Sequence, residues 1–289
     1  MQIVQADDVP AREVSGHRTG HIEFQQLMQG ELGAPDNFEF SRVHNHGSFY
    51  SPRHRHNFEQ VRFVLSGEFE YAARKRMKQG SVGFFPEGTP YGPQNVTECV
   101  TLVLQCGGPS GEGFMSYRQL HDGHLELAKL GTFKNGVFTR AGASNRAPGV
   151  RKNQDGYEAI WEHVNGRKLT YPKPRYSEPV IMYPDAIAWA PAGTRGVERK
   201  TCGIFDRNVT IEMMRLAPGA RWAVEAPRAI QLLYTVAGRG TANGAAWRAE
   251  CAIQVVRGER VEIAAAEETT LLHIGMAEIE ARAATHRAA

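Results

Sequence analysis

Short runs of apolar or alternating residues, separated by glycine, proline and asparagine, recur in two long stretches of this chain. QVRFVLSGEFEYA, which starts at Gln60, and QLLYTVAGRGTANG, which starts at Gln231, are the clearest examples. A period of two and many β-branched or aromatic residues are typical of strands, and regularly spaced short strands indicate a sandwich or barrel. The pattern therefore predicts an all-β protein.

The segment between these stretches has a different pattern. Apolar residues recur at spacings of three and four over residues 116–130 and 154–164, which predicts two helices. The proline-rich stretch YPKPRYSEP follows and leads into the second β-rich half. We expect a partly helical connector between two β-rich domains.

The two β-rich halves align with each other in one register. NFEFSRVHNHG from Asn37 aligns with NVTIEMMRLAPG from Asn208 at an offset of 208 − 37 = 171. At the same offset Gln60 falls on Gln231, because 231 − 60 = 171. One residue is then lost, and FFPEG aligns with QVVRG. Self-similarity of this kind indicates a duplicated domain.

Composition narrows the class of protein. The 289 residues are 42% hydrophobic and 22% charged, and 34 basic against 31 acidic side chains give a net charge of +3. These values are typical of a globular protein and provide no basic excess for binding nucleic acid.

The first residues, MQIVQADDVPAREV, lack an apolar run, and no segment reaches the ~18 apolar residues of a membrane span, so we expect neither a signal peptide nor a membrane partner. The four cysteines are far apart with no CxxC pair, which predicts free thiols and a cytoplasmic location.

Four histidines lie in two pairs within the stretch HNHGSFYSPRHRHNFEQ. Residues two apart on a strand share a face, so His54 and His56 would present two imidazoles to one cavity. Imidazole binds Fe, Zn, Cu and Ni alike, so the pair predicts a metal site without selecting the metal. His44 and His46 form a second pair, which either joins this site or faces solvent beside a turn.

Around these histidines the chain resembles the two sequence motifs of the cupin family. The first motif, Gly, His-x-His, an acid and Gly, is similar to Gly47, His54, His56, Gln60 and Gly67. The second motif is similar to Gly80, Pro86, Gly88, Tyr91 and Asn95. Two such halves make a bicupin, and the resemblance covers roughly residues 35–108 and 205–276. It implies two antiparallel, jelly-roll-like β-barrels, with one metal ion inside the first.

Two ligand positions depart from the cupin pattern. The usual Glu is replaced by Gln60, a neutral and weaker ligand, and the usual His is replaced by Tyr91. A free phenol titrates near pH 10, so Tyr91 would ligate only if a nearby ferric ion lowered its pKa; otherwise it stays an uncharged hydrogen-bonding group or a general acid. No usual metal site is expected in the second half, whose ligand positions are Glu225, Pro227, Gln231 and Val261.

Arg62 alternates with apolar residues in QVRFVLS and therefore shares a face with Gln60. A guanidinium inside a barrel is costly unless it is paired, and its planar fork suits a carboxylate. Either a carboxylate-bearing ligand enters the cavity, or Arg62 pairs with an internal acid such as Glu39 or Glu68.

The repeat and the resemblance together divide the chain into four parts. We expect an N-terminal arm at residues 1–34, a first cupin barrel at 35–112, a connector with helices at 113–180 and a degenerate second barrel at 181–280. Barrel edges need to be covered, so we also expect a homo-oligomer, most simply a dimer.

The resemblance implies a metal-dependent enzyme that acts on a small organic acid, an oxygenase similar to the cupin dioxygenases. His54 and His56 would hold the ion, with Gln60 as a weak third ligand or a hydrogen-bond partner. Arg62 would orient the substrate, and Tyr91 would ligate the metal or act as an acid. Iron is the first choice of metal, with Mn, Ni or Zn as alternatives, and an isomerase or lyase would use the same residues. The alternative from another class is a non-catalytic small-molecule-binding bicupin whose metal site has decayed.

Overall fold

The computed structural model describes residues 1–14, 17–142 and 151–278, which belong to two compact units. The N-terminal unit comprises Ala6–Gly33 and Asn37–Asp185, and the C-terminal unit comprises Met1–Gln5, Ala34–Asp36 and Ala186–Ala289. The segment 1–34 therefore supplies residues to both units. Within the described residues, no helix has the length and apolar character that crossing a membrane requires.

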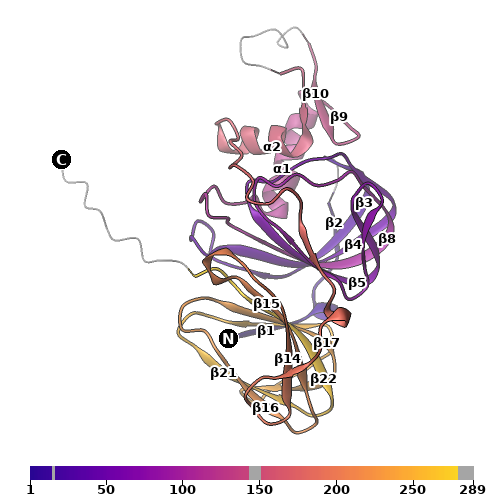
Figure 1. Cartoon of the computed structure of the whole chain (residues 1–289). Helices are drawn as coiled ribbons and strands as arrows, with labels where there is room; N and C mark the ends of the chain where they lie inside the picture. Colours follow the sequence, from indigo (N-terminus) through magenta and orange to yellow (C-terminus); the bar gives the residue numbers. More distant parts are fainter. Residues whose placement is uncertain (15–16, 143–150, 279–289) are drawn as a thin grey trace, which may run out of the picture. The chain divides into compact units, whose positions relative to one another are not determined.

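The N-terminal unit is built on an 8-stranded antiparallel sheet (Figure 1). The strands follow the order β12-β7-β5-β8-β4-β3-β2, and β6 pairs with β5. Their bounds are β2 (Arg12–Val14), β3 (Thr19–Gln29), β4 (Phe38–Ser51), β5 (Glu59–Ala72), β6 (Lys75–Lys78), β7 (Val82–Phe85), β8 (Gln94–Cys106) and β12 (Val180–Met182). The longest strands, β4, β5 and β8, are neighbours, and they carry most of the site described below.

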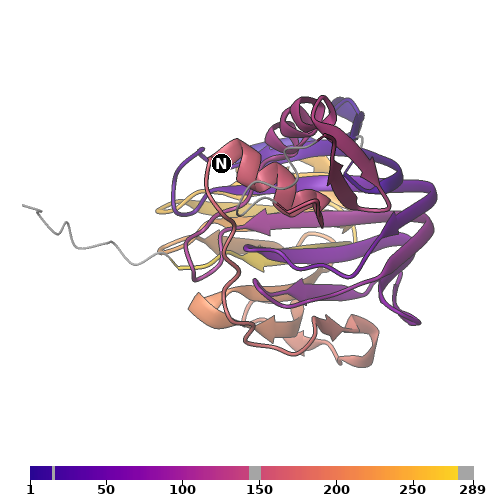
Figure 2. The same cartoon turned by 90° about the horizontal axis from the view of Figure 1, so that it is seen from above.

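The connector contains the two predicted helices, which lie against each other (Figures 1 and 2). Ser116 caps α1 (Tyr117–Ala128) in a capping box with Gln119, and Asp155 caps α2 (Gly156–Asn165) through two backbone N–H groups. The left-handed Gly166 ends α2. A small sheet accompanies the helices and consists of β9 (Gly131–Lys134), β10 (Val137–Arg140) and β11 (Asn153–Asp155).

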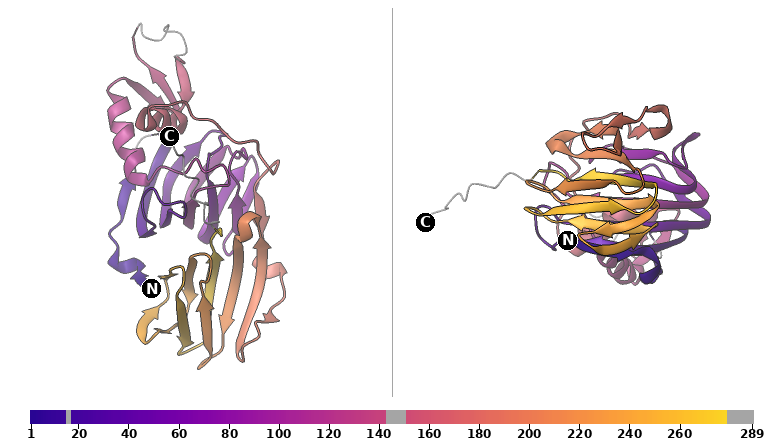
Figure 3. Two further views of the ribbon diagram at one scale, coloured as in Figure 1. Left: turned by 90° about the vertical axis from the view of Figure 1, so that its left-hand side faces the viewer. Right: turned by 90° about the horizontal axis from the view of Figure 1, so that it is seen from below.

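The C-terminal unit has a 7-stranded sheet in the order β1-β20-β17-β22-β15-β14-β13 and a 4-stranded sheet in the order β16-β21-β18-β19 (Figure 3). The first sheet contains β1 (Gln2–Gln5), β13 (Ala190–Pro191), β14 (Val197–Ile204), β15 (Thr210–Leu216), β17 (Gln231–Ala237), β20 (Cys251–Val255) and β22 (Thr269–Gly275). The second contains β16 (Arg221–Glu225), β18 (Arg239–Ala242), β19 (Ala245–Arg248) and β21 (Arg260–Ala265). Three short 3-10 helices complete the described structure: η1 (Ala6–Asp8), η3 (Pro184–Ala186) and η4 (Asp206–Asn208).

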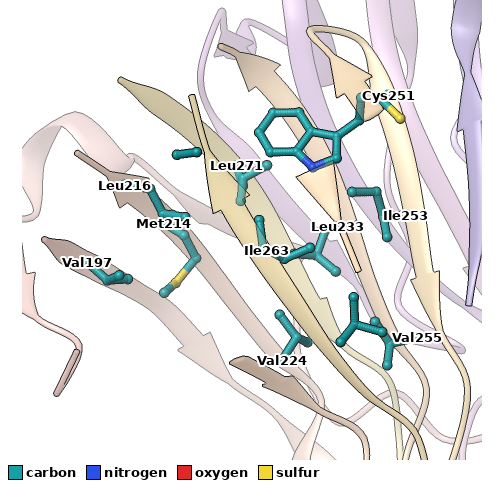
Figure 4. Packing of buried hydrophobic residues seen from close by; sticks show 14 of the residues in the cluster. Val197, Met214, Leu216, Val224, Leu233, Cys251, Ile253, Val255, Ile263 and Leu271 are labelled. Atoms are coloured by element: carbon teal, nitrogen blue, oxygen red, sulfur yellow. The ribbon is translucent and has the colours of Figure 1, made fainter. Parts of the chain in front are cut away.

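Apolar side chains from both sheets form the core of the C-terminal unit (Figure 4). Leu233, Ile253 and Val255 come from the 7-stranded sheet, and Val224 and Ile263 come from the 4-stranded sheet. All five are at most 2% exposed, so the space between the sheets is filled by hydrocarbon. This filling limits where polar chemistry can occur in the unit.

Strand pairing repeats between the two units in the register that the sequence predicts. Gln60 pairs across its neighbouring strands with Phe85 and Gln105. Gln231 pairs in the same way with Val255 and Gly275, and 255 − 85 and 275 − 105 both equal 170, one less than the offset of 171 before the lost residue. The chain is mostly β with antiparallel sheets, as expected.

Candidate active site

The segment that contains His54 and His56 lies between β4 and β5 and is not part of a regular strand. An isolated antiparallel bridge joins His54 to Tyr91, with both backbone N···O distances at 2.9 Å. Gly88 N–H donates to the His56 carbonyl at 2.7 Å, which ties the second motif to the first. The two imidazole rings lie 5.0 Å apart between centroids. The sequence prediction of a shared strand is wrong in this detail, but the bridge still brings the pair together.

Both histidines are neutral bases with one nitrogen already occupied. The Pro52 carbonyl lies 2.7 Å from Nδ1 of His54 and accepts a hydrogen bond from the N–H there, which leaves the Nε2 lone pair free. Burial, with a further contribution from the Arg18 guanidinium, lowers the pKa of His54 to about 3. Burial and the neighbouring His54 also hold the pKa of His56 well below its ordinary value. Neutral imidazoles supported by a carbonyl are typical of metal-binding histidines.

The side-chain oxygen of Gln60, the atom that would bind a metal, already accepts two hydrogen bonds. Its Oε1 accepts from the Tyr91 hydroxyl at 3.2 Å and from Arg62 Nη2 at 3.2 Å. Burial raises the pKa of Tyr91, so the side chain is a neutral phenol with one proton to donate. Because that proton goes to Gln60, the His56 Nδ1 at 3.3 Å from the hydroxyl is the donor of that pair, and its Nε2 is free.

Arg62 makes no ion pair with a carboxylate in the described part of the chain. Its guanidinium lies 4.7 Å from the centre of the Phe69 ring, and its nitrogens donate to the Gln60 amide and interact with the Tyr91 hydroxyl. Of the two acids considered from the sequence, Glu68 pairs with Arg76 at 3.1 Å and Glu39 accepts from a backbone N–H. The partner of this partly buried cation is therefore not one of the described acids.

Glu39 is a further polar residue of this interior, and sequence reasoning considered it only as a partner for Arg62. It pairs across β8 with Gln105, which pairs with Gln60, so the three side chains form one row on the inner face. Glu39 is 0% exposed, and its Oε1 has no hydrogen-bond partner. Burial raises the pKa of Glu39 to about 7, against a hydrogen bond from the Tyr117 amide that opposes the shift. The alternation of residues along β4 could have placed the Glu39 side chain on the inner face from the sequence.

The connector covers one side of the histidine pair. The Tyr157 hydroxyl, on α2, donates to Asn57 Oδ1 at 3.0 Å, and its ring lies 5.0 Å from that of His56. Arg18 pairs with Asp155 at 2.8 Å, and both contribute to the electrostatics of His54. Because these residues are far from the cupin motifs in sequence, no local pattern indicated them.

His44 and His46 lie on the other face of β4. They alternate with Glu39, and the pairing of β4 with β8 is regular between these positions. Their contacts are with Glu98 and Glu23, respectively, and not with His54 or His56. The sequence left open whether this pair joins the site, and the structure places it apart.

The inner residues fit a divalent metal only in part. Two free imidazole nitrogens are suitable ligands, but within the described residues the only cluster of three His, Cys, Asp or Glu ligand atoms is Glu23, His44 and His46. The inner pair therefore lacks a protein carboxylate, and the Gln60 oxygen is directed at the Arg62 cation. An ion held by His54 and His56 would need an anionic ligand from solution.

Comparison with known proteins identifies a domain in the N-terminal half and a similar overall fold. Residues 43–104 match the family model of the cupin domain. The fold is similar to that of "a putative dioxygenase" from Nostoc punctiforme, with a TM-score of 0.64 and 11% identity over 98% of this chain and 84% of that one. It is also similar to an oxalate decarboxylase from Bacillus subtilis studied for its Mn(II) centres, with a TM-score of 0.54 and 14% identity over 97% of this chain and 78% of that one. No curated protein sequence matches the chain. The chain therefore contains a cupin domain in its N-terminal half, and its fold is similar to that of these two proteins.

Proposed function

We propose that the N-terminal unit is a cupin barrel that acts on a small carboxylate-bearing molecule as a metal-dependent enzyme, an oxygenase of the dioxygenase kind. The observation that carries this proposal is the partly buried guanidinium of Arg62, which has no carboxylate partner among the described residues. The C-terminal unit is the degenerate second barrel of the pair. Its ligand positions hold no histidine.

Charge complementarity supports a carboxylate substrate. The interior combines a positive Arg62 with two neutral histidines and a neutral phenol. A substrate carboxylate would satisfy the planar guanidinium fork and would also supply the anionic ligand that the protein does not provide. One substrate carboxylate would therefore both pair with Arg62 and complete the ligands of the metal at His54 and His56.

His54 and His56 would hold the metal through their Nε2 atoms, since both Nδ1 atoms are occupied. A bound divalent ion supplies Lewis-acid or redox chemistry, and we propose iron for the oxygenase. The two hydrogen bonds at Nδ1 orient the rings before any ligand arrives. Tyr157 and Asn57 limit the access of water to His56.

Proton handling falls to Tyr91 and Glu39. Tyr91 keeps its proton at neutral pH, so it donates a hydrogen bond to a developing negative charge on the substrate. Glu39, with a pKa of about 7, exists in both protonation states near neutrality, as a proton acceptor or donor should. Gln105 lies between Glu39 and Gln60 in the row, and its Oε1 accepts from Gln60 Nε2 at 3.3 Å.

A second candidate is a non-catalytic binding protein for the same class of small acids. The observation that favours it is the Gln60 oxygen, which already accepts from Tyr91 and Arg62 and is thus a poor metal ligand. In this candidate the histidine pair contributes hydrogen bonds and shape but holds no ion.

Titration calorimetry with oxalate, pyruvate and benzoate tests the carboxylate site. Arg62→Ala should weaken binding of the best of these probes at least about 30-fold, because a buried charge pair is lost. Arg215→Ala is the control, since this arginine already pairs with Glu198 at 2.6 Å. Equal affinities of the Arg62→Ala and unaltered chains would remove the basis of both candidates.

Elemental analysis separates the two candidates. The untagged chain is expressed with added iron, alone and as His54→Ala, both in a His46→Ala background that removes other surface binding. Near-stoichiometric iron that is lost with His54→Ala supports the oxygenase. Manganese, nickel or zinc in its place favours a cupin isomerase or lyase, and carboxylate binding without metal selects the binding protein.

We further propose a cytoplasmic homodimer. The four cysteines are free thiols in the structure, as a reducing compartment would keep them. Sedimentation of the full chain tests the assembly.

A further inference from the structure

A second group of potential metal ligands lies on the outer face of the N-terminal sheet. Glu23 on β3 pairs in register with His44 on β4, and His21 pairs with His46 two residues further along. One ligand atom from each of Glu23, His44 and His46 lies within 4.8 Å of the other two. These three residues are on the face opposite to Glu39 and are therefore separate from the inner histidine pair.

The positions of two of the ligand atoms match those around one ion. His46 Nε2 lies 3.2 Å from Glu23 Oε2, yet this nitrogen forms no hydrogen bond. The two atoms are therefore in contact without the alignment of a hydrogen bond. In a tetrahedral zinc site with bonds of 2.0–2.1 Å, neighbouring ligand atoms are separated by about 3.3 Å.

The neighbouring residues support the same arrangement. Glu98 on β8 contacts the His44 ring through Nε2, and carboxylates of this kind orient histidines that bind metals. The His44 and His46 rings lie 3.6 Å apart between centroids. The side chains of His46 and Glu23 are 36% and 47% exposed, so the cluster lies at the surface, although the His46 Nε2 atom itself is buried.

We propose that Glu23, His44 and His46 form a surface site for a divalent cation of the zinc class. Two imidazoles and one carboxylate are ligand types that zinc takes, and solvent completes the coordination. The site does not depend on the function proposed for the interior. The simplest alternative is a set of ordinary exposed His–Glu pairs, of which His163 and Glu126 at 2.6 Å are an example in this chain.

Zinc titration of the full chain, stripped with a chelator and without a tag, tests the site. Calorimetry should show one bound equivalent of zinc that persists in His56→Ala and is lost in His46→Ala. Glu23→Gln should weaken this equivalent at least about tenfold, and Glu98→Gln about 10- to 100-fold, as for other supporting carboxylates. His163→Ala is the matched control and should bind as the unaltered chain does.

Zinc stoichiometry that is unchanged in both His46→Ala and Glu23→Gln would overturn the proposal. Circular dichroism confirms that each variant is folded, and Glu23→Gln keeps the shape of the side chain. The inner pair is measured separately by His56→Ala, so a failure of the interior site and a failure of the surface site give different results.

Discussion

The two units carry a glutamine at corresponding positions of corresponding strands, Gln60 on β5 and Gln231 on β17, but the two side chains have different surroundings. Gln231 belongs to a closed network: its Oε1 accepts from His273 Nε2 at 2.9 Å and its Nε2 donates to a carbonyl at 3.0 Å. His273 Nδ1 also lies 3.3 Å from Glu212, so both ring nitrogens have partners within the unit. Gln60 instead accepts from Arg62, which has no carboxylate partner among the residues that the structure describes.

Two further positions of the repeat explain the difference. Arg62 corresponds to Leu233, since 233 − 62 = 171, and Leu233 is 0% exposed in the apolar core. Glu39 corresponds to Thr210 by the same offset, so the C-terminal unit has no acid at the position of the buried Glu39. The repeated glutamine therefore serves the hydrogen bonding of the fold, and the residues around it decide whether the interior can bind an anion.

The largest expected effect comes from Glu39→Gln. The unfolded chain loses this proton near pH 4.5 and the folded chain near pH 7, so between these values a rise in pH favours unfolding. The pKa difference corresponds to about 3 kcal/mol, reached above pH 7 and absent below pH 4.5. Urea unfolding from pH 4 to pH 8 should show the variant gaining stability over the unaltered chain by that amount. A stability difference that does not change with pH would contradict the assignment of Glu39 as the unusual acid.

A smaller effect is expected when the closed network of the other unit is opened. His273→Val introduces the residue that the N-terminal unit carries at the matching position 103, since 273 − 170 = 103. Glu212 and Gln231 then lose a partner, which costs about 2 kcal/mol in the free energy of unfolding. Urea unfolding measures the cost, while oxalate affinity should stay unchanged. Lost oxalate binding in a folded His273→Val chain would show that the two interiors do not differ in function as proposed.

The smallest expected effect, about tenfold in affinity, comes from giving the site its missing acid. Gln60→Glu places a carboxylate where an amide oxygen now lies 3.2 Å from Arg62. The new ion pair should weaken oxalate binding, and the charged ligand should strengthen metal binding at His54 and His56. Calorimetry with oxalate and with Mn²⁺ checks both directions. Gln231→Glu is the matched control. An equal change in oxalate and Mn²⁺ affinity in that variant would contradict the proposed difference between the two units.

Several features of the fold follow from local patterns, and the structure confirms them. The helices at α1 and α2 lie where the spacing of apolar residues placed them, because that period and the capping residues act within a few residues of each other. Arg62 shares a face with Gln60 because alternation on a strand is a local rule. The repeat was visible because strand lengths and turn glycines are kept in one register.

Other features of the site depend on distant parts of the chain. The sequence did not predict that Tyr157 would cover His56, or that Arg18 and Asp155 would contribute to the electrostatics of His54. These contacts join the connector to the histidine segment, and their geometry depends on packing rather than on any local pattern.

The sequence by itself determined the β pattern, the duplication, the histidine pair and the position of Arg62 beside Gln60. Only the tertiary structure decided that Arg62 has no acid partner in the described interior and that Glu39 lies in one row with Gln105 and Gln60. It also decided that His44 and His46 lie on the outer face with Glu23. The physical reason is strand register: alternation determines which residues of one strand share a face, but only the pairing of distant strands determines which residues lie beside them.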